Sequence, residues 1–404
     1  MRILMIAPEP FFEPRGTPFS EFHRIRALTA LGHQVDLVTY PFGEDVSMPG
    51  LRVIRCLRPP FVTRVKIGPS AAKFPLDALL TLTALRVALG GKYDAVHSHE
   101  EGGVIGVVLS AFLRIPHLYD MHSSLPQQLT NFAFTGSSVA RGIVRFFEKL
   151  MINRSKVVIV ICPALEDTVR ETAPGANVVL IENAPGSAGE SATPEQAAAV
   201  RATHGLAPQT PLVLYTGTFE AYQGLDLLFA SMAHVKAACP EARLLLAGGK
   251  PDQVEKARAQ AAAAGIGDVA LFAGERPAAE IPAYLLACDA LVSPRSRGTN
   301  TPLKIYQYLR SGKAIVATRL MTHTQVLDDT TSILTGVSPR EFADGILLAL
   351  NDRAKAAALG ANAQHLAETK YSYEAYLDKT RRACAALFSD LPPLSPGSPV
   401  KDVA

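Results

Sequence analysis

The chain has 404 residues, of which 48% are hydrophobic and 19% charged, and its formal net charge at pH 7 is +3. This length predicts two domains, each with its own core, and the small net charge argues against a nucleic-acid-binding protein. The five cysteines are scattered without a C-x-x-C pair, so we expect buried thiols in a reducing compartment and neither a disulfide framework nor a zinc site.

No segment has the pattern of a membrane span or a signal peptide. The apolar N-terminal run ends at Pro8, too early for a signal peptide. The longest apolar stretch, residues 75–90, is interrupted by Asp77 and Arg86. We therefore expect a soluble or peripheral protein in the cytoplasm.

The first half of the chain alternates short apolar runs with helical patterns. The apolar residues between Phe19 and Leu31 recur at helical spacing, and Gly32 closes that helix. Residues 104–113 are apolar throughout and predict a buried helix. Strands are expected at residues 2–7, 35–39, 51–55, 94–97, 117–121, 157–161 and 177–181.

A segment rich in Pro, Gly and Ser, residues 184–211, separates this half from a second alternating series and carries a short helix before Pro208. Three amphipathic helices are expected to close the chain, the last at residues 373–387, followed by a disordered tail. The second series predicts strands at residues 212–215, 243–247, 269–272, 290–292 and 315–318, and helices at 224–238, 251–264, 281–287 and from Pro302.

Alternating strands and helices predict parallel sheets covered by helices on both faces, so this is an α/β chain of two Rossmann-like domains. In such sheets ligands bind beyond the carboxyl ends of the strands. The expected division is residues 1–184 for the first domain, 185–210 for a linker, 211–370 for the second domain, 371–388 for a helix returning to the first, and 389–404 for the tail.

The stretch from Ser293 to Gly312 is the most informative part of the second half. It follows an apolar strand and predicts a helix with Thr301 as N-cap and Pro302 in the first turn. Free N–H groups at a helix start, flanked by cations, suit an anion such as a diphosphate. The alternative is an ordinary crossover with solvated basic side chains. The cations are Arg295, Arg297 and Lys304.

Glycines end three further strands of this half, in residues 215–224, 247–249 and 272–276. Glycine allows a ligand to approach the backbone closely, although it also ends strands for local reasons. Together with the 293–312 segment, these turns favour a nucleotide-diphosphate site in the second domain.

In the first half, polar side chains follow two neighbouring strands. His97, His99 and Glu100 end one strand, and Asp120 and His122 end the next. They predict an active-site floor, with His97 more typical of a structural hydrogen-bonded residue. A metal site is not favoured, because the H-x-x-x-H spacing of helical zinc ligands is missing.

The loop after the first strand, residues 8–18, contains Gly16 just before a helix and could contact an anion or a substrate. It lacks the G-x-G-x-x-G spacing, so a dinucleotide site is only weakly supported. A loop stiffened by its prolines is the alternative.

These patterns resemble the retaining glycosyltransferases of the GT-B fold, specifically family 4, from Met1 to about Leu387. Residues 31–35 are similar to the family's Leu-Gly-His-x-Val, and residues 93–99 to its Asp-hydrophobic-hydrophobic-His-x-His. The other matching segments, in family order, are residues 217–228, 246–249, 272–276 and 312–317.

The resemblance implies two Rossmann-like domains facing across a cleft, the first binding the acceptor and the second the nucleotide sugar. It implies a hexosyl- or related glycosyltransferase (EC 2.4) that acts without metal or cofactor and retains the anomeric configuration. The implied acceptor is a hydroxyl group of a glycan or lipid-linked molecule, in cell-envelope polysaccharide synthesis.

The chain departs from the family at its charged positions. The family's two glutamates eight positions apart fall on Thr299 and Gln307, and its Arg and Lys in the first donor-domain loop fall on Thr218 and Gln223. We infer that Arg295, Arg297 or Lys304 replaces the missing cations. The alternatives are a catalytically weak or inactive binding protein and, less favoured, a sugar-nucleotide epimerase.

Three sets of site residues follow. The catalytic set is His122, Arg295, Arg297 and Lys304, where the resemblance implies that His122 contacts the transferred sugar. The donor-binding set is Gly217, Thr218, Gln223, Gly248, Gly274, Arg276, Thr299, Asn300, Thr301, Leu303 and Gln307. The acceptor-side set is Arg15, Gly16, Thr17, His99 and Glu100.

One loop mixes cations with large apolar residues and suits either peripheral contact with an anionic membrane or an ordinary acceptor-side loop. Prolines at 59, 60, 69 and 75 are expected to prevent a long helix. The cations are Arg58, Arg64, Lys66 and Lys73, and the apolar residues are Phe61, Val62, Ile67 and Phe74.

Overall fold

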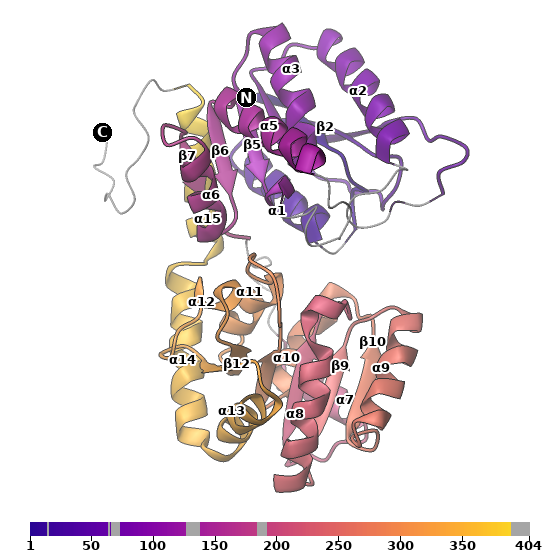
Figure 1. Cartoon of the computed structure of the whole chain (residues 1–404), viewed down its shortest axis with the longest axis vertical. Coiled ribbons are helices and arrows are strands. Elements are labelled where there is room, and N and C mark those ends of the chain that lie inside the picture. Colours follow the sequence, from indigo (N-terminus) through magenta and orange to yellow (C-terminus); the bar gives the residue numbers. More distant parts are fainter. Residues whose placement is uncertain (14–15, 64, 66–72, 127–137, 184–191, 389–404) are drawn as a thin grey trace. The chain divides into compact units, whose positions relative to one another are not determined.

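A computed structural model describes residues 1–13, 16–63, 65, 73–126, 138–183 and 192–388. The chain forms two units, one built from Met1–Ala184 with Glu374–Ala404 and the other from Pro185–Tyr373 (Figure 1). Each unit has one parallel sheet with helices on both faces. The expected tail, residues 389–404, lies outside the described residues.

The first unit contains a seven-stranded parallel sheet with the order β3-β2-β1-β4-β5-β6-β7. The order reverses between β1 and β4, and in open parallel sheets such a reversal is where ligands bind, beyond the carboxyl ends of the strands. The strands are β1 (Arg2–Ala7), β2 (Gln34–Thr39), β3 (Leu51–Arg55), β4 (Ala95–His99), β5 (His117–Met121), β6 (Val157–Val160) and β7 (Val178–Leu180).

Helices cover both faces of this sheet, because successive strand side chains point to opposite faces. Leu4 and Val96 pack with Leu80 of α2 on one face, and Ile3 packs with Ile25 of α1 on the other. The helices are α1 (Gly16–Ala30), α2 (Lys73–Leu89), α3 (Gly103–Leu113), α5 (Ser138–Arg154), α6 (Pro163–Thr172) and α15 (Tyr373–Ala386), with a 3-10 turn, η1 (Glu100–Gly102).

Two sequence expectations about these helices are wrong. Pro75 does not prevent a long helix, because it lies in the first turn of α2, where its missing N–H is not needed. Helix α3 is not buried along its length: it buries Gly103, Gly106 and Leu109, while its outer face remains exposed.

The last described helix, α15, packs against the first unit although it follows the second unit in sequence. Tyr376 lies in a core cluster with Leu118 and Ile159 of the first sheet. The guanidinium carbon of Arg24 on α1 lies over the ring of Tyr376, 5.0 Å from its centroid. The chain therefore crosses between the units twice.

The second unit contains a six-stranded parallel sheet with the order β10-β9-β8-β11-β12-β13, which reverses between β8 and β11. Its strands are β8 (Leu212–Thr216), β9 (Arg243–Ala247), β10 (Ala270–Gly274), β11 (Ala290–Ser293), β12 (Ala314–Thr318) and β13 (Ile333–Thr335). Its helices are α7 (Pro194–Thr203), α8 (Leu225–Ala238), α9 (Pro251–Ala263), α10 (Ile281–Ala287), α11 (Leu303–Arg310), α12 (Met321–Thr324), α13 (Pro339–Asn351) and α14 (Arg353–Thr369). Two 3-10 turns, η2 (Ala221–Gln223) and η3 (Ala278–Glu280), complete the unit as described.

Candidate functional site

In the second unit, the loops that follow β8 and β11 touch each other at the point where the strand order reverses. A Cβ atom on Gly224 would lie 2.0 Å from the carbonyl oxygen of Pro294, and one on Gly248 would lie 1.9 Å from that of Gly217. Both glycines have positive φ, 76° and 136°. Only glycine allows these backbones to approach so closely, so the glycine-ended strands meet in one place.

Lys304, in the first turn of α11, directs its amine toward the loop that follows β8. Its Nζ lies 3.8 Å from the ring centroid of Tyr215 and 3.7 Å from where a Cβ of Gly217 would stand. The side chain is buried, and among the described residues Nζ has no hydrogen-bond partner. Burial, assisted by the charge of Arg295, lowers the pKa of Lys304 well below its ordinary value. An unpartnered buried amine is suited to receive an anionic ligand.

Arg295 holds the loop between β11 and α11. Its Nη1 donates to the carbonyl oxygen of Asn300 at 2.6 Å and to the hydroxyl of Thr322 at 3.0 Å. The guanidinium carbon lies 4.9 Å from the ring centroid of Tyr222. Burial lowers the pKa of Arg295. Of the three predicted cations, Arg295 and Lys304 are brought together, whereas Arg297 is exposed.

The start of α11 differs from the expected capping pattern. The helix begins at Leu303 and Pro302 occupies the N-cap position, so the prediction of Thr301 as N-cap is wrong. The Thr301 hydroxyl is buried without a hydrogen-bond partner among the described residues. Pro302 offers no side-chain acceptor, so the N-cap side chain does not satisfy the first N–H groups of α11, and these groups suit an anionic ligand.

The remaining residues predicted to bind the donor lie on the second unit as well. Gln223 donates to Thr218 across 3.4 Å, so both neutral side chains face each other in the β8 loop. Arg276 is half-exposed and pairs with Glu280 at 3.7 Å. Gly274, Thr299, Asn300, Leu303 and Gln307 lie at the carboxyl end of β10, in the β11–α11 loop and on α11.

His323, which the sequence analysis missed, joins β11 to β12 beside this site. Its Nε2 lies 2.8 Å from the Ser293 hydroxyl, and its Nδ1 lies 2.8 Å from the Thr318 carbonyl oxygen. Burial lowers the pKa of His323 to about 3, so the ring is neutral at pH 7. A single His inside a short, uncapped helix carries no sequence signal that separates it from a surface residue.

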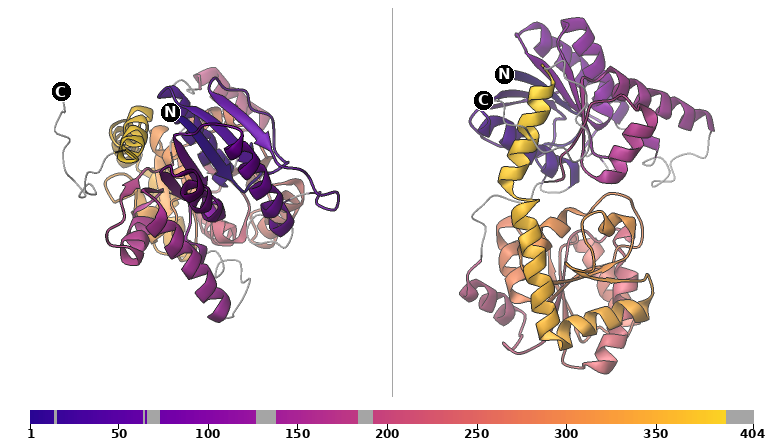
Figure 2. Two further views of the ribbon diagram at one scale, coloured as in Figure 1. Left: turned by 90° about the horizontal axis from the view of Figure 1, so that it is seen from above. Right: turned by 90° about the vertical axis from the view of Figure 1, so that its left-hand side faces the viewer.

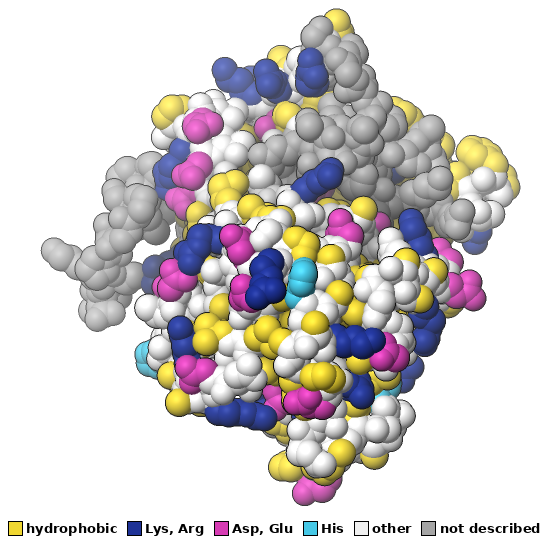
Figure 3. All heavy atoms as spheres, turned by 60° about the horizontal axis from the view of Figure 1, so that its bottom comes forward, with side chains coloured by type: hydrophobic (Ala, Val, Ile, Leu, Met, Phe, Trp, Pro, Cys, Tyr) yellow, Lys and Arg dark blue, Asp and Glu magenta, His cyan; other side chains and the backbone are white. Residues whose placement is uncertain are grey.

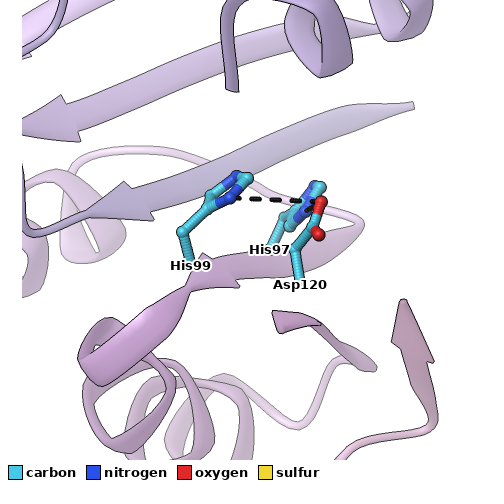
Figure 4. Close-up of side chains that lie close together, drawn as sticks. All are labelled: His97, His99 and Asp120. Atoms are coloured by element: carbon cyan, nitrogen blue, oxygen red, sulfur yellow. Dashed lines mark ion pairs between the residues drawn. The ribbon is translucent and has the colours of Figure 1, made fainter. Parts of the chain in front are cut away.

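In the first unit, the strand-end residues of β4 and β5 form one buried cluster (Figure 4). Asp120 lies at its centre, with its Oδ2 at 3.4 Å from His97 Nε2 and its Oδ1 at 3.3 Å from His122 Nε2. The Nδ1 of His99 lies 3.1 Å from Nε2 of His122. The sequence thus correctly placed these residues at neighbouring strand ends.

Arg24 on α1, which the sequence analysis did not select, completes the cluster. Its Nε donates to Asp120 Oδ2 at 2.8 Å, and both side chains are fully buried. Burial opposes ionisation of Asp120, but the charge of Arg24 outweighs it and holds the pKa of the carboxyl well below its usual range. Burial lowers the pKa of His122 as well, so the ring is neutral beside a carboxylate.

The atoms of His97, His99 and Asp120 that could bind a metal lie within 4.8 Å of one another. However, the Asp120 carboxylate already accepts from the guanidinium of Arg24. A divalent ion there would share one carboxylate with a buried cation, which Coulomb repulsion disfavours. We therefore interpret the cluster as a hydrogen-bonded scaffold for His122.

On the acceptor side, Glu100 bridges the ends of β4 and β5. Its carboxylate accepts from the Ser123 hydroxyl at 3.0 Å, its φ is 46°, and burial raises its pKa well above the ordinary value. Gly16 and Thr17 begin α1, while the predicted Arg15 lies outside the described residues.

A pair of buried carboxyl groups, Glu9 after β1 and Glu21 on α1, also escaped the sequence analysis. Burial raises the pKa of Glu21 to about 8, and burial together with the charge of Glu21 raises that of Glu9. Glu21 and Arg24 lie on the inward face of α1, where the sequence pattern predicted only apolar residues.

The loop proposed for membrane contact is only partly described, since Arg64, Lys66 and Ile67 lie outside the described residues. Lys73 forms an ion pair with Glu101, and Val62 is buried. These two residues do not face solvent as the sequence analysis expected. None of the helices in the described part of the chain has the length and apolarity that a membrane span requires.

Two family models match the chain. One, described as glycosyl transferases group 1, matches residues 197–366, and the other, described as glycosyl transferase 4-like domain, matches residues 23–184. Together they cover the sheets of both units.

Curated relatives and solved structures agree with these matches. A phosphatidyl-myo-inositol mannosyltransferase of Mycolicibacterium smegmatis is 24% identical over 87% of this chain and 84% of its own. A D-inositol 3-phosphate glycosyltransferase of Xylanimonas cellulosilytica is 28% identical over 84% of each chain.

Among solved structures, sucrose-phosphate synthase of Thermosynechococcus elongatus aligns with a TM-score of 0.78 at 21% identity, over 96% of this chain and 99% of its own. The Anabaena protein HepE in complex with UDP-glucose aligns at 0.73 and 17%, over 96% and 100%. At these identities the structures establish the fold, which is GT-B.

Proposed function

Because the chain belongs to the group 1 glycosyltransferase family and is a nucleotide-sugar glycosyltransferase, we propose that it transfers a hexose or related sugar to a hydroxyl acceptor. The proposed transfer retains the configuration at the anomeric carbon and uses no metal. The observation that carries this proposal is the buried amine of Lys304 at the start of α11, which has no hydrogen-bond partner in the part of the chain that the structure describes. It lies where the loops after β8 and β11 meet, the position at which a sheet of this topology binds phosphates.

In the proposed site the diphosphate is bound by the N–H groups at the start of α11 and by the ammonium form of Lys304. Arg295 adds positive charge nearby and fixes the loop by its bond to Asn300. Fixed cations stabilise the negative charge that grows on the leaving diphosphate. Exposed Arg297 contributes less, because solvent screens its charge.

The reaction proposed needs no protein nucleophile. The bond between the anomeric carbon and the diphosphate oxygen breaks, and the acceptor oxygen attacks from the same face. The leaving oxygen takes the hydroxyl proton, so atoms and charge balance. Neutral His122, held by Asp120 and His99, is proposed to contact the transferred sugar.

The acceptor is proposed to be a glycan or a lipid-linked molecule. Support comes from relatives whose names refer to phosphatidyl-myo-inositol and to inositol 3-phosphate. An enzyme reaches a lipid-linked acceptor at the membrane surface, so peripheral contact with an anionic membrane is part of this proposal.

A catalytically weak nucleotide-sugar-binding protein is the second candidate. The observation that favours it is the neutral set Thr218, Gln223, Thr299 and Gln307 at positions where the family carries charge. Losing one fixed cation could cost about 3 kcal/mol of transition-state stabilisation, or a factor of about a hundred in rate.

Thermal shift with UDP-, GDP- and ADP-sugars identifies the donor, since a ligand at about a hundred times its Kd stabilises by about 2.7 kcal/mol. Donor hydrolysis and transfer are then followed by NMR, in which the anomeric coupling constant reports retention. Binding without turnover would support the second candidate, and an inverted product would refute retention.

A further inference from the structure

One helical layer of the first unit exposes more large apolar side chains than all other described parts of the chain together. Helices α2, α3 and α5 cover the same face of the first sheet and pack in that order. Their exposed large apolar residues are Phe74, Leu82, Leu85, Leu89, Val108, Phe112, Val139, Ile143, Phe146 and Phe147. The described part of the second unit exposes four, Tyr222, Leu286, Met321 and Val337. We name this outer face the α2–α3–α5 face.

The N-terminal half of α5 projects from the unit (Figure 2). Ile143 and Phe146 are 52% and 62% exposed, and a Cβ atom on Gly142 would meet nothing within 4 Å. The helix enters the core only from Glu148 onward, with Met151 and Ile152 buried. Packing therefore explains the second half of α5 but not the apolar side chains of the first half.

The exposed charges described on α5 are all basic. Arg141, Arg145, Lys149 and Arg154 are exposed. The carboxylate of Glu148 is instead turned inward, where it accepts from the N–H of Leu125 at 2.8 Å. Helix α3 carries no charged residue, and α2 adds an exposed Arg86.

From this combination we infer that the α2–α3–α5 face is the surface by which the protein binds an anionic membrane. The apolar side chains of α5 enter the boundary between headgroups and acyl chains, while its arginines contact lipid phosphates. By contrast, the face in Figure 3 intersperses acidic and basic side chains, which gives no preference for an anionic surface.

A second copy of the chain fits this surface less well. A twofold dimer would bring the same basic helix of each copy together, and like charges would repel at the contact. The inference rests on the proposed function, because an enzyme meets a lipid-linked acceptor at such a surface. It shares Phe74 with the sequence-based loop prediction but none of that loop's cations, of which Lys73 is already paired with Glu101.

The test is flotation of the full-length protein with vesicles of phosphatidylglycerol and phosphatidylcholine, compared with vesicles of phosphatidylcholine alone. The wild type should float with the anionic vesicles at low salt and less at high salt. Ile143→Ser with Phe146→Ser should weaken binding tenfold or more, and Arg141→Gln with Arg145→Gln by about fivefold per arginine.

Matched controls come from the second unit. Met321→Ser with Val337→Ser replaces apolar residues of similar exposure, 51% and 47%, and Arg340→Gln replaces a highly exposed arginine. These variants should float like the wild type. All replaced side chains are exposed, so helix content and melting temperature should not change, which separates lost binding from lost folding.

UDP affinity, measured without vesicles, separates this inference from the proposed function. If the α5 variants no longer float but bind UDP normally, membrane binding through the α2–α3–α5 face is supported. If the wild type floats but binds no nucleotide, only the proposed function is refuted. Absence of flotation at low salt, or α5 variants that float normally, overturns the inference. A wild-type dimer that the α5 variants dissociate would instead identify a second copy as the occupant and also overturns it.

Discussion

Lys304→Met is expected to make the second unit more stable and the protein a poorer nucleotide binder. Methionine fills nearly the same space without the amine, so the variant removes a buried donor that has no partner among the described residues. Leaving such a group unsatisfied costs about 1–3 kcal/mol. The gain should raise the melting temperature by about 2–4 °C for each kcal/mol in a domain of this size.

The expected loss in affinity follows from the same amine. A hydrogen bond between charged groups contributes about 1.5–3 kcal/mol, so UDP should bind the Lys304→Met variant about ten- to a hundredfold more weakly. Isothermal titration with UDP and thermal unfolding without it measure the two effects. Lys256→Met, at an exposed position of α9, is the matched control and should change neither.

The pH dependence supplies an independent check on Lys304. Its pKa in the folded state lies well below the ordinary 10.5. Between these two pKa values the unfolded chain holds a proton on Lys304 that the folded chain does not, so the free energy of unfolding rises with pH. Binding of the diphosphate favours the ammonium form and takes up a proton, so UDP affinity should fall with rising pH, by at most about tenfold per unit. The variant should lose both slopes. A Met variant that melts below the wild type, or binds UDP equally well, would refute this account of the site.

Three further predictions concern the first unit. Arg24→Met should destabilise it by about 3–5 kcal/mol in chemical denaturation, because Asp120 is left as a buried charge, whereas Arg86→Met at an exposed position of α2 should change little. Since the pKa of Asp120 is depressed, this stabilisation is present above the unfolded pKa near 4 and is lost as the pH falls below it. Between pH 4.5, the unfolded pKa of Glu21, and about 8, only the folded state holds the proton, so wild-type stability should decline by up to ~1.4 kcal/mol per pH unit. Glu21→Gln should remove this decline, and an unchanged pH profile would contradict the assignment. His122→Ala should lower turnover strongly and leave UDP affinity nearly unchanged; equal loss of both would show that the ring only supports the fold.

The sequence alone determined the order and type of most elements. Strict alternation of apolar runs and helical patterns has few solutions other than parallel sheets with helices on both faces, and the runs at residues 2–7, 51–55, 117–121 and 243–247 match the observed strands. It also located the loops that form the candidate donor site, because glycines and cations at strand ends are local features.

Tertiary structure decided which of these residues face one another and in which state of charge. Nothing in the local sequence distinguishes Lys304, whose buried amine has no hydrogen-bond partner among the residues described, from the exposed Arg297 a few positions away. Likewise, Arg24 and Asp120 are 96 residues apart in the chain, and their ion pair exists only because α1 packs beside the end of β5. Ionisation and hydrogen bonding depend on the groups that surround a side chain after folding, and these come from distant segments that periodicity and spacing do not specify.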